Sequence, residues 1–139
     1  MPITYTNVIQ DNVIDSLNTL LSDEFSVPIY YDEHKGNQSF LLTPSEDSAV
    51  SFTNNSSTRS YSFEISYQIA SGGVYHKNKL KQVTEIAERV KRLIHNNSSY
   101  SPSSVDKWID ARIETINYEK DENKQSAVME FICTSVESL

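Results

Sequence analysis

The stretch RSYSFEISYQIAS, residues 59–71, decides the fold. Its apolar side chains occupy alternate positions, and the positions between them are polar. The apolar set is Tyr61, Phe63, Ile65, Tyr67 and Ile69. Alternation with a period of two predicts a β-strand with one apolar face and one polar face. The apolar face must be covered by other elements, and the polar face needs an explanation of its own.

Two amphipathic helices are predicted to supply that cover. In residues 7–25 apolar side chains recur at helical spacing, and Asn7 with Gln10 three residues later is typical of a helix N-cap. Residues 78–95 carry a second apolar stripe. The two stripes consist of Ile9, Val13, Ile14, Leu17, Leu20 and Leu21, and of Leu80, Val83, Ile86, Ala87, Val90, Leu93 and Ile94.

Shorter apolar runs separated by turn residues predict the remaining strands. We expect strands at 27–31, 39–43, 48–52, 108–118 and 126–136, with turns at 32–37, 44–47 and 119–125 and a polar loop at 53–60. The predicted order is α-β-β-β-β-α-β-β. The fold class is therefore α+β, an antiparallel sheet with two amphipathic helices packed on one face, in a single domain spanning residues 1–139.

Composition narrows the function. A net charge of −7 disfavours a general nucleic-acid binder, because such proteins are normally basic. Cys133 is the single cysteine, so no disulfide within the chain is possible, and a reducing compartment is expected. The N-terminal residues show no basic region followed by an apolar run, and we expect neither a signal peptide nor a membrane-spanning segment.

Residues with catalytic or metal-binding chemistry are few. The cluster Asp32, Glu33 and His34 lies at a predicted turn, where adjacent residues rarely converge on one metal ion. His76 and His95 flank the second helix, and a histidine at a helix C-terminus is explained by the helix dipole. Cys133 lies in an alternating strand and is expected to be buried. We expect no metal, cofactor or catalytic residue.

Charge is unevenly distributed along the chain. Residues 77–95 carry six lysines and arginines against two glutamates, a net charge of +4 that leaves −11 on the remainder. A basic helix on an acidic body suits a solvated face, self-association or a local nucleic-acid contact. Eight tyrosines are many for this length, and exposed tyrosines are typical of protein interfaces.

The order of elements resembles that of the tail terminator, or tail completion, proteins of long-tailed bacteriophages. The likeness rests on NVIQDNVIDSLNTLL, on the hairpin VPIYY…SFLLTPSED, on RSYSFEISYQI, on KNKLKQVTEIAERVKRLI and on WIDARIETINY…AVMEFICTS, which together cover nearly the whole chain. The resemblance implies a ring, typically of six subunits, that caps the growing tail tube and then joins the tail to the head. It implies no catalysis and no cofactor.

The resemblance also implies partners, and the charged and polar side chains then suggest interface residues. The partners are further copies of the chain, the tail tube protein, and head–tail connector or neck proteins. DNA passes through the ring without sequence-specific binding. We expect the loop at 53–60, with Arg59, to contact the next ring of the tube. The residues expected at subunit contacts are Glu64, Gln68, Lys77, Lys81 and Arg92. The expected location is the tail–neck region of the virion, and the host cytoplasm during assembly.

Three other functions stay open. The chain resembles other head–tail connector proteins in the same features. A small α+β hydrolase would have to use Asp32, Glu33 and His34, the one compact group of suitable residues. An acidic inhibitor that mimics nucleic acid fits the net charge of −7, although the acidic residues are interspersed with lysines rather than laid in runs.

Overall fold

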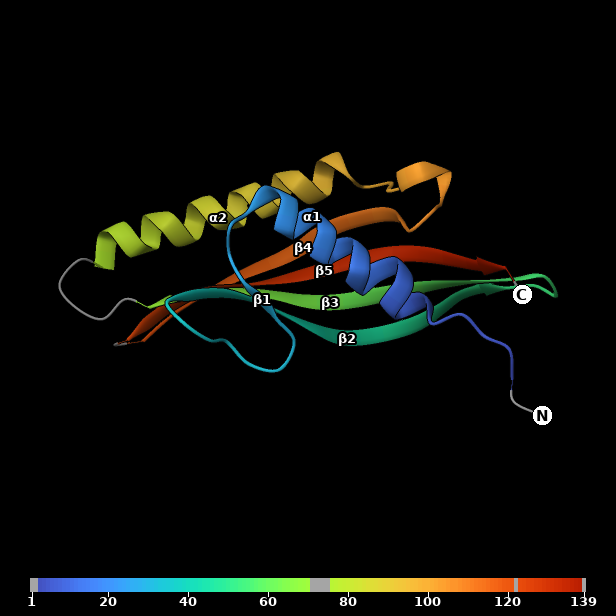
Figure 1. Cartoon of the computed structure of the whole chain (residues 1–139), viewed down its shortest axis with the longest axis horizontal. Helices are drawn as coiled ribbons and strands as arrows, with labels where there is room; N and C mark the ends of the chain where they lie inside the picture. The colour runs from blue at the N-terminus through green and yellow to red at the C-terminus, as the bar shows by residue number, and fades with distance from the viewer. Residues whose placement is uncertain (1–2, 71–75, 122, 139) are drawn as a thin grey trace.

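The computed structural model describes residues 3–70, 76–121 and 123–138, without the side chains of 76–78 and 138. It has an α+β fold with a mixed five-stranded sheet in the order β1-β2-β3-β5-β4 (Figure 1). The elements in chain order are the π-helix Ile9–Ile14, α1 Asp15–Glu24, β1 Ile29–Tyr30, β2 Gln38–Phe52, β3 Ser56–Ala70, α2 His76–Asn96, the 3-10 turn Pro102–Ser104, β4 Ile109–Lys120 and β5 Lys124–Ser138.

β3 contains most of the alternating stretch at 59–71, and it lies at the centre of the sheet. It pairs along its whole length with β2 on one side and β5 on the other. The side chains of Tyr61, Phe63, Ile65, Tyr67 and Ile69 are each at most 4% exposed. The predicted apolar face is confirmed. We call the face formed by these residues and by their β5 partners, the odd-numbered residues from 125 to 133, the inner face.

Both helical segments pack on the inner face. The Asn12 amide of the π-helix donates a 3.1 Å hydrogen bond to Ser135 of β5, which continues the same row of side chains. On α2, the Gln82 amide donates a 3.3 Å hydrogen bond to the Tyr67 hydroxyl. Residues of both predicted helical stripes join the inner face in one hydrophobic core. This arrangement agrees with the predicted cover, except that Leu80, predicted to face the core, is 50% exposed.

The two helices also contact each other through Arg89 of α2. Its guanidinium donates hydrogen bonds to the Glu24 carbonyl oxygen (3.1 Å) and carboxylate (2.9 Å), and it lies 4.4 Å from the centre of the Phe25 ring. The Phe25 ring in turn meets Phe40 of β2 at 5.3 Å. One arginine therefore joins the C-terminal end of α1 to α2 directly above the core.

The prediction of a turn at 44–47 between two strands is wrong, because β2 is one continuous strand. Pro44 pairs with Phe63 and is followed by a bulge, after which Glu46 pairs with Ser62. β1 pairs only with Phe40 and Leu41, so the rest of β2 is a sheet edge. Proline is tolerated at an edge because no neighbouring strand needs its missing N–H. Three strands, not four, therefore precede α2.

The prediction of an entirely antiparallel sheet is also wrong, because β1 runs parallel to β2. A parallel pair cannot be closed by a tight hairpin, so residues 31–37 must carry the chain back to the end of the sheet where β1 began. Gly36 has a φ of +76° in this loop, which agrees with its predicted role in the turn. Figure 1 shows the loop on the side of the sheet away from the helices.

Several element boundaries differ from their predictions. β3 begins at Ser56, so the predicted loop at 53–60 shrinks to a turn at 53–55. β4 and β5 each extend into the predicted turn at 119–125. The Gln10 backbone N–H donates to the Asn7 side-chain oxygen at 3.2 Å, as expected of a cap, but the Gln10 side chain bonds Asp15 instead of returning to Asn7.

Candidate interaction surface

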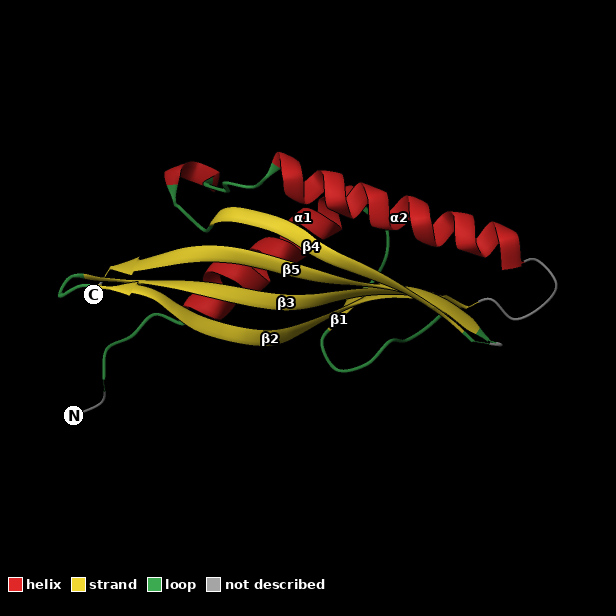
Figure 2. Cartoon of the chain, turned by 180° about the vertical axis from the view of Figure 1, so that it is seen from behind, coloured by secondary structure: helices red, strands yellow, loops and turns green. Residues whose placement is uncertain are grey.

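The polar face of the sheet is a broad surface that the described helices leave uncovered. It is formed by even-numbered residues of β3 and β5 that lie opposite each other, and we call it the outer face. Figure 2 shows β2, β3 and β5 in front of α1 from this side. The facing pairs are Ser60–Thr134, Ser62–Ile132, Glu64–Glu130, Ser66–Val128 and Gln68–Ser126. Three of the five β3 residues are serines, and two of the five β5 residues, Val128 and Ile132, are aliphatic.

Two carboxylates meet at the centre of the outer face. Glu64 and Glu130 are direct partners across β3 and β5, and both side chains are exposed. Like charges directly opposite each other in a sheet are destabilising. Glu46 of β2 lines the same depression, which has a volume of about 350 Å³. Within the described part of the chain, none of these three glutamates forms an ion pair.

A second depression, of about 390 Å³, adjoins the first. Glu64 and Val128 line both of them. His34, from the loop that crosses this face, forms part of its lining. The imidazole Nδ1 is 2.7 Å from the Ser39 hydroxyl, and Nε2 is 3.0 Å from the Ser66 hydroxyl. The histidine thus fixes the crossing loop to both β2 and β3.

The environment of His34 favours its neutral form. Burial lowers the pKa of His34, and the positive charge of Lys124 lowers it further. A neutral imidazole has one donor and one acceptor nitrogen, which matches one hydroxyl on each side. In a serine hydrolase the nitrogen facing away from the nucleophile donates to a carboxylate, which stabilises the imidazolium. Here a hydroxyl takes that place, so the geometry suits a structural contact better than a general base.

The other sequence-predicted chemical residues are not brought together. Asp32 forms an ion pair with Lys35 at 3.3 Å, and the pKa of its carboxyl is lowered by the Glu33 backbone N–H and by Lys35. Among the described residues, no three histidine, cysteine, aspartate or glutamate side chains gather in a way that suits a metal ion. Burial raises the pKa of Cys133 to about 12, so its thiol stays protonated.

The basic helix presents charge on the opposite side of the molecule. Lys81, Lys91 and Arg92 of α2 are all exposed, and we call them the basic face. Lys81 lies 4.0 Å from Glu85, and Lys91 lies 2.7 Å from Glu88. Such exposed pairs contribute roughly 0.3–0.5 kcal/mol each to stability. They are therefore too weak to prevent Lys81 and Lys91 from binding another partner. The Lys77 side chain lies outside the described residues, as does that of His76.

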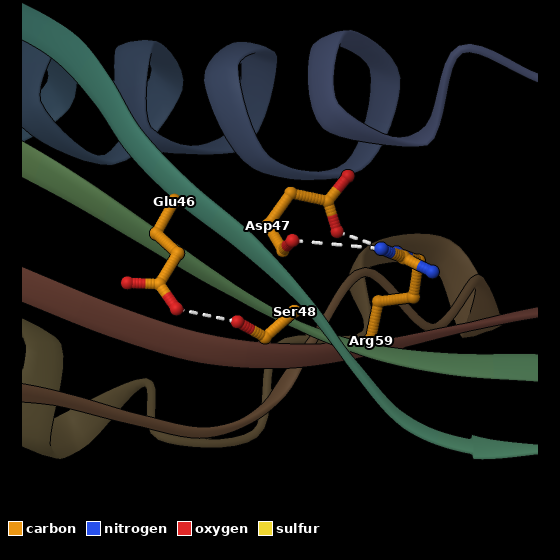
Figure 3. Close-up of polar contacts among 4 residues, drawn as sticks. All are labelled: Glu46, Asp47, Ser48 and Arg59. Atoms are coloured by element: carbon orange, nitrogen blue, oxygen red, sulfur yellow. Dashed lines mark hydrogen bonds and ion pairs between the residues drawn. The ribbon is translucent and has the colours of Figure 1, made fainter.

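Arg59 lies in β3 near the hairpin end of the sheet, not in the predicted loop at 53–60, and its side chain has a partner within the chain. Its Nε is 2.5 Å from Asp47 Oδ1 across β2 and β3. Figure 3 shows this pair on one side of β2, with Glu46 and Ser48 on the other. Asp47 faces Tyr61, so the ion pair belongs to the inner face. Contact between this region and the tube stays a prediction.

The hairpin end exposes apolar side chains that the sequence patterns did not single out. Val50 and Phe52 of β2 are 59% and 74% exposed, and Val136 of β5, at the same end of the sheet, is 51% exposed. The sequence contained a signal for this exposure. An apolar residue beside a polar turn, with no helix to cover it, must face solvent or a partner. Glu64 and Gln68, by contrast, lie on the face that the alternation predicted.

Comparisons with known proteins give no family assignment. No protein-family model matches the sequence. No curated protein matches it at a significant level either. Among the described residues, no helix has the length and the apolar character required to cross a bilayer.

Proposed function

We propose that this chain is a structural protein of a long-tailed bacteriophage that assembles into a ring and caps the tail tube, as tail terminators do. The main support for the proposal is the exposed, charged outer face of the sheet. Two long strands, β3 and β5, form it, the described helices leave it uncovered, and a pair of facing carboxylates lies at its centre. A surface of this size, built from unmatched charges and aliphatic side chains, suits contact between subunits.

The chemistry of the described residues supports a structural role. His34 is held between two hydroxyls, and the thiol of Cys133 is buried and protonated. A ring-forming cap needs surfaces rather than a nucleophile, a metal or a cofactor. In this proposal the ring, of about six copies, stops polymerisation of the tube and then offers a surface to connector or neck proteins. DNA passes through it, and the protein resides in the tail–neck region of the virion.

The first test is the solution mass of the purified chain by light scattering, followed by negative-stain imaging. The proposal expects ring-shaped particles with about six times the chain mass of 15.8 kDa. A ring that forms only on its template would give a monomer alone. In that case tail tubes are added, and the ends of the tubes are inspected for caps. Uncapped ends at saturating protein would contradict the tube-capping role, and binding to connectors alone would favour a neck protein.

One observation favours a second candidate, a small hydrolase. The 3.0 Å contact between His34 Nε2 and the Ser66 hydroxyl, beside a depression of about 390 Å³, has the spacing of a base and a nucleophile. The test is turnover of short-chain ester substrates by the wild type, by Ser66→Ala and by His34→Ala. Turnover that both substitutions abolish would establish this function, and equal background rates in all three would remove it.

A further inference from the structure

The two charged surfaces of this molecule face in opposite directions. α2 packs on the inner face through Gln82 and its apolar stripe, so its basic face points away from the sheet. The outer face, with Glu64 and Glu130, lies on the other side of the same sheet. A contact that joins one surface to the other must therefore join two different molecules. Such a contact is heterologous, and heterologous contacts generate rings when the rotation between subunits closes.

The outer carboxylates need an explanation that solvation does not supply. An antiparallel sheet tolerates one wet face, so exposure alone is ordinary. A like-charge pair at directly opposed positions costs stability, and other polar residues would avoid that cost. The arrangement is useful when a cation from another molecule lies over both carboxylates. Glu64 lines both adjoining depressions, and Lys120 and Lys124 of the same chain line one of them. Within the described part of the chain neither lysine forms an ion pair with Glu64 or Glu130, so a cation from another molecule still has a place there.

Within this chain, α2 is the best source of that cation. Residues 77–95 hold six of the 12 lysines and arginines, and the rest of the chain has a net charge of −11. Lys91 and Arg92 line a depression of about 350 Å³ on the exposed side of α2, together with Glu88 and His95. Arg92 forms no ion pair within the described part of the chain. Its guanidinium is free to bind a carboxylate with two hydrogen bonds.

We propose that the outer face of one subunit, centred on Glu64 and Glu130, binds the basic face of α2 of the next copy. This inference rests on the proposed function in one respect, namely that the chain assembles with itself. It names the two surfaces that meet and the direction of assembly, head to tail. Because the contact is between charges near solvent, salt weakens it, and the assembly should dissociate between about 0.15 and 1 M salt.

The test is a charge swap between two variants. The first variant, Glu64→Lys with Glu130→Lys, has two basic surfaces. The second, Lys91→Glu with Arg92→Glu, has two acidic surfaces. Each alone should lose self-association by tenfold or more, since facing surfaces then repel. In an equimolar mixture every contact is complementary again, and alternating assemblies of the wild-type mass should return. Light scattering of each variant and of the mixture gives the result.

Matched controls separate surface chemistry from net charge and from folding. Asp11→Asn with Asp23→Asn removes two exposed carboxylates from the helical side, and it should leave the association unchanged. Glu64→Gln with Glu130→Gln has the same change in net charge as this control, and it should weaken association. Circular dichroism and thermal melting establish that each variant folds. If the lysine variant does not fold, the glutamine variant, the acidic variant and the control still decide the question.

The outcomes distinguish this inference from the proposed function. Wild-type mass in either reversal variant would overturn the inference, and so would two failed variants that do not rescue each other. If the wild type alone is a monomer, the same mixture is scored for caps on tail tubes. Rescue of assembly without tube capping supports the inference and contradicts the proposed function. Normal capping by both reversal variants supports the proposed function and overturns the inference.

Discussion

The two faces of one sheet follow different rules, although the same strands build both. On β5, Phe131 is fully buried against the Trp108 ring, with 5.3 Å between ring centres, whereas the next residue, Ile132, points to the outer face. The side chains of the inner face must exclude water, so their pattern in the sequence predicts the structure closely. The outer face is free of that need. The residues it carries are therefore better evidence of what the molecule meets.

The largest expected difference between the faces comes from truncating those two neighbours. Phe131→Ala should lower the free energy of unfolding by about 3–5 kcal/mol, because it opens a cavity in the core. Ile132→Ala should lower it by roughly 1 kcal/mol or less, because its site is already partly open to solvent. Urea unfolding of the two variants measures both effects. Similar losses at the two positions would mean that something covers the outer face in the isolated chain.

A hydrogen-bond network at the rim of the inner face allows a finer comparison. The Tyr67 hydroxyl donates to the Gln38 side-chain oxygen at 2.6 Å and accepts from Gln82 at 3.3 Å, which joins β3, β2 and α2. Tyr67→Phe should cost about 1–2 kcal/mol of unfolding free energy, since the partly buried Gln38 and Gln82 amides then keep only their long 3.4 Å bond to each other. Tyr118→Phe, at a tyrosine that is 47% exposed, is the matched control and should change little.

The sequence predicted the inner face well because alternation and helical spacing are local patterns. Every apolar residue in the series from Tyr61 to Ile69 is buried, and both helices lie close to their predicted ranges. It failed where a long-range arrangement overrides local signals. Pro44 and the polar residues after it have the composition of a turn, but an open sheet edge accommodates them as a bulge within β2. Likewise, nothing in residues 27–31 distinguishes a parallel from an antiparallel partner.

The candidate surface was predictable only in part, for the same reason. Alternation places Glu64 and Gln68 on the polar face, and the charge count marks α2 as basic. The facing of Glu64 and Glu130 depends on the register between β3 and β5, which are separated by α2 and β4. The position of His34 depends on the parallel return of the chain. Neither juxtaposition has a local sequence signal.

The outer face also makes stability depend on pH, because it includes His34, a partly buried titratable group. Its folded pKa is lowered by burial and by Lys124, so the unfolded chain takes up a proton at higher pH than the folded chain does. Stability is therefore complete above the ordinary histidine pKa of about 6.5 and falls as pH drops below it toward the folded pKa. His34→Gln should remove this part of the acid sensitivity, as measured by melting temperature between pH 7 and 5.

The control for this prediction is His95→Gln, at an exposed histidine of α2. The slope of melting temperature against pH should be shallower in His34→Gln than in the wild type and in His95→Gln. A common slope in all three proteins would mean that His34 does not fix the loop in solution. The loop from 31 to 37 would then lie free of Ser39 and Ser66.

The smallest expected effect bears most directly on the meaning of the outer face. If Glu64 and Glu130 repel each other in the isolated subunit, Glu64→Gln should raise the free energy of unfolding by about 0.2–1 kcal/mol at low salt. Adding Glu130→Gln should give little more, because the repulsion is already gone, and the double-mutant cycle measures that coupling. Added salt should shrink the gain. A variant that is more stable as a monomer yet weaker in assembly would show that the carboxylates serve a partner. A loss of stability would mean that the two carboxylates already have favourable contacts within the chain. That result would contradict the inference that they bind a cation from another copy.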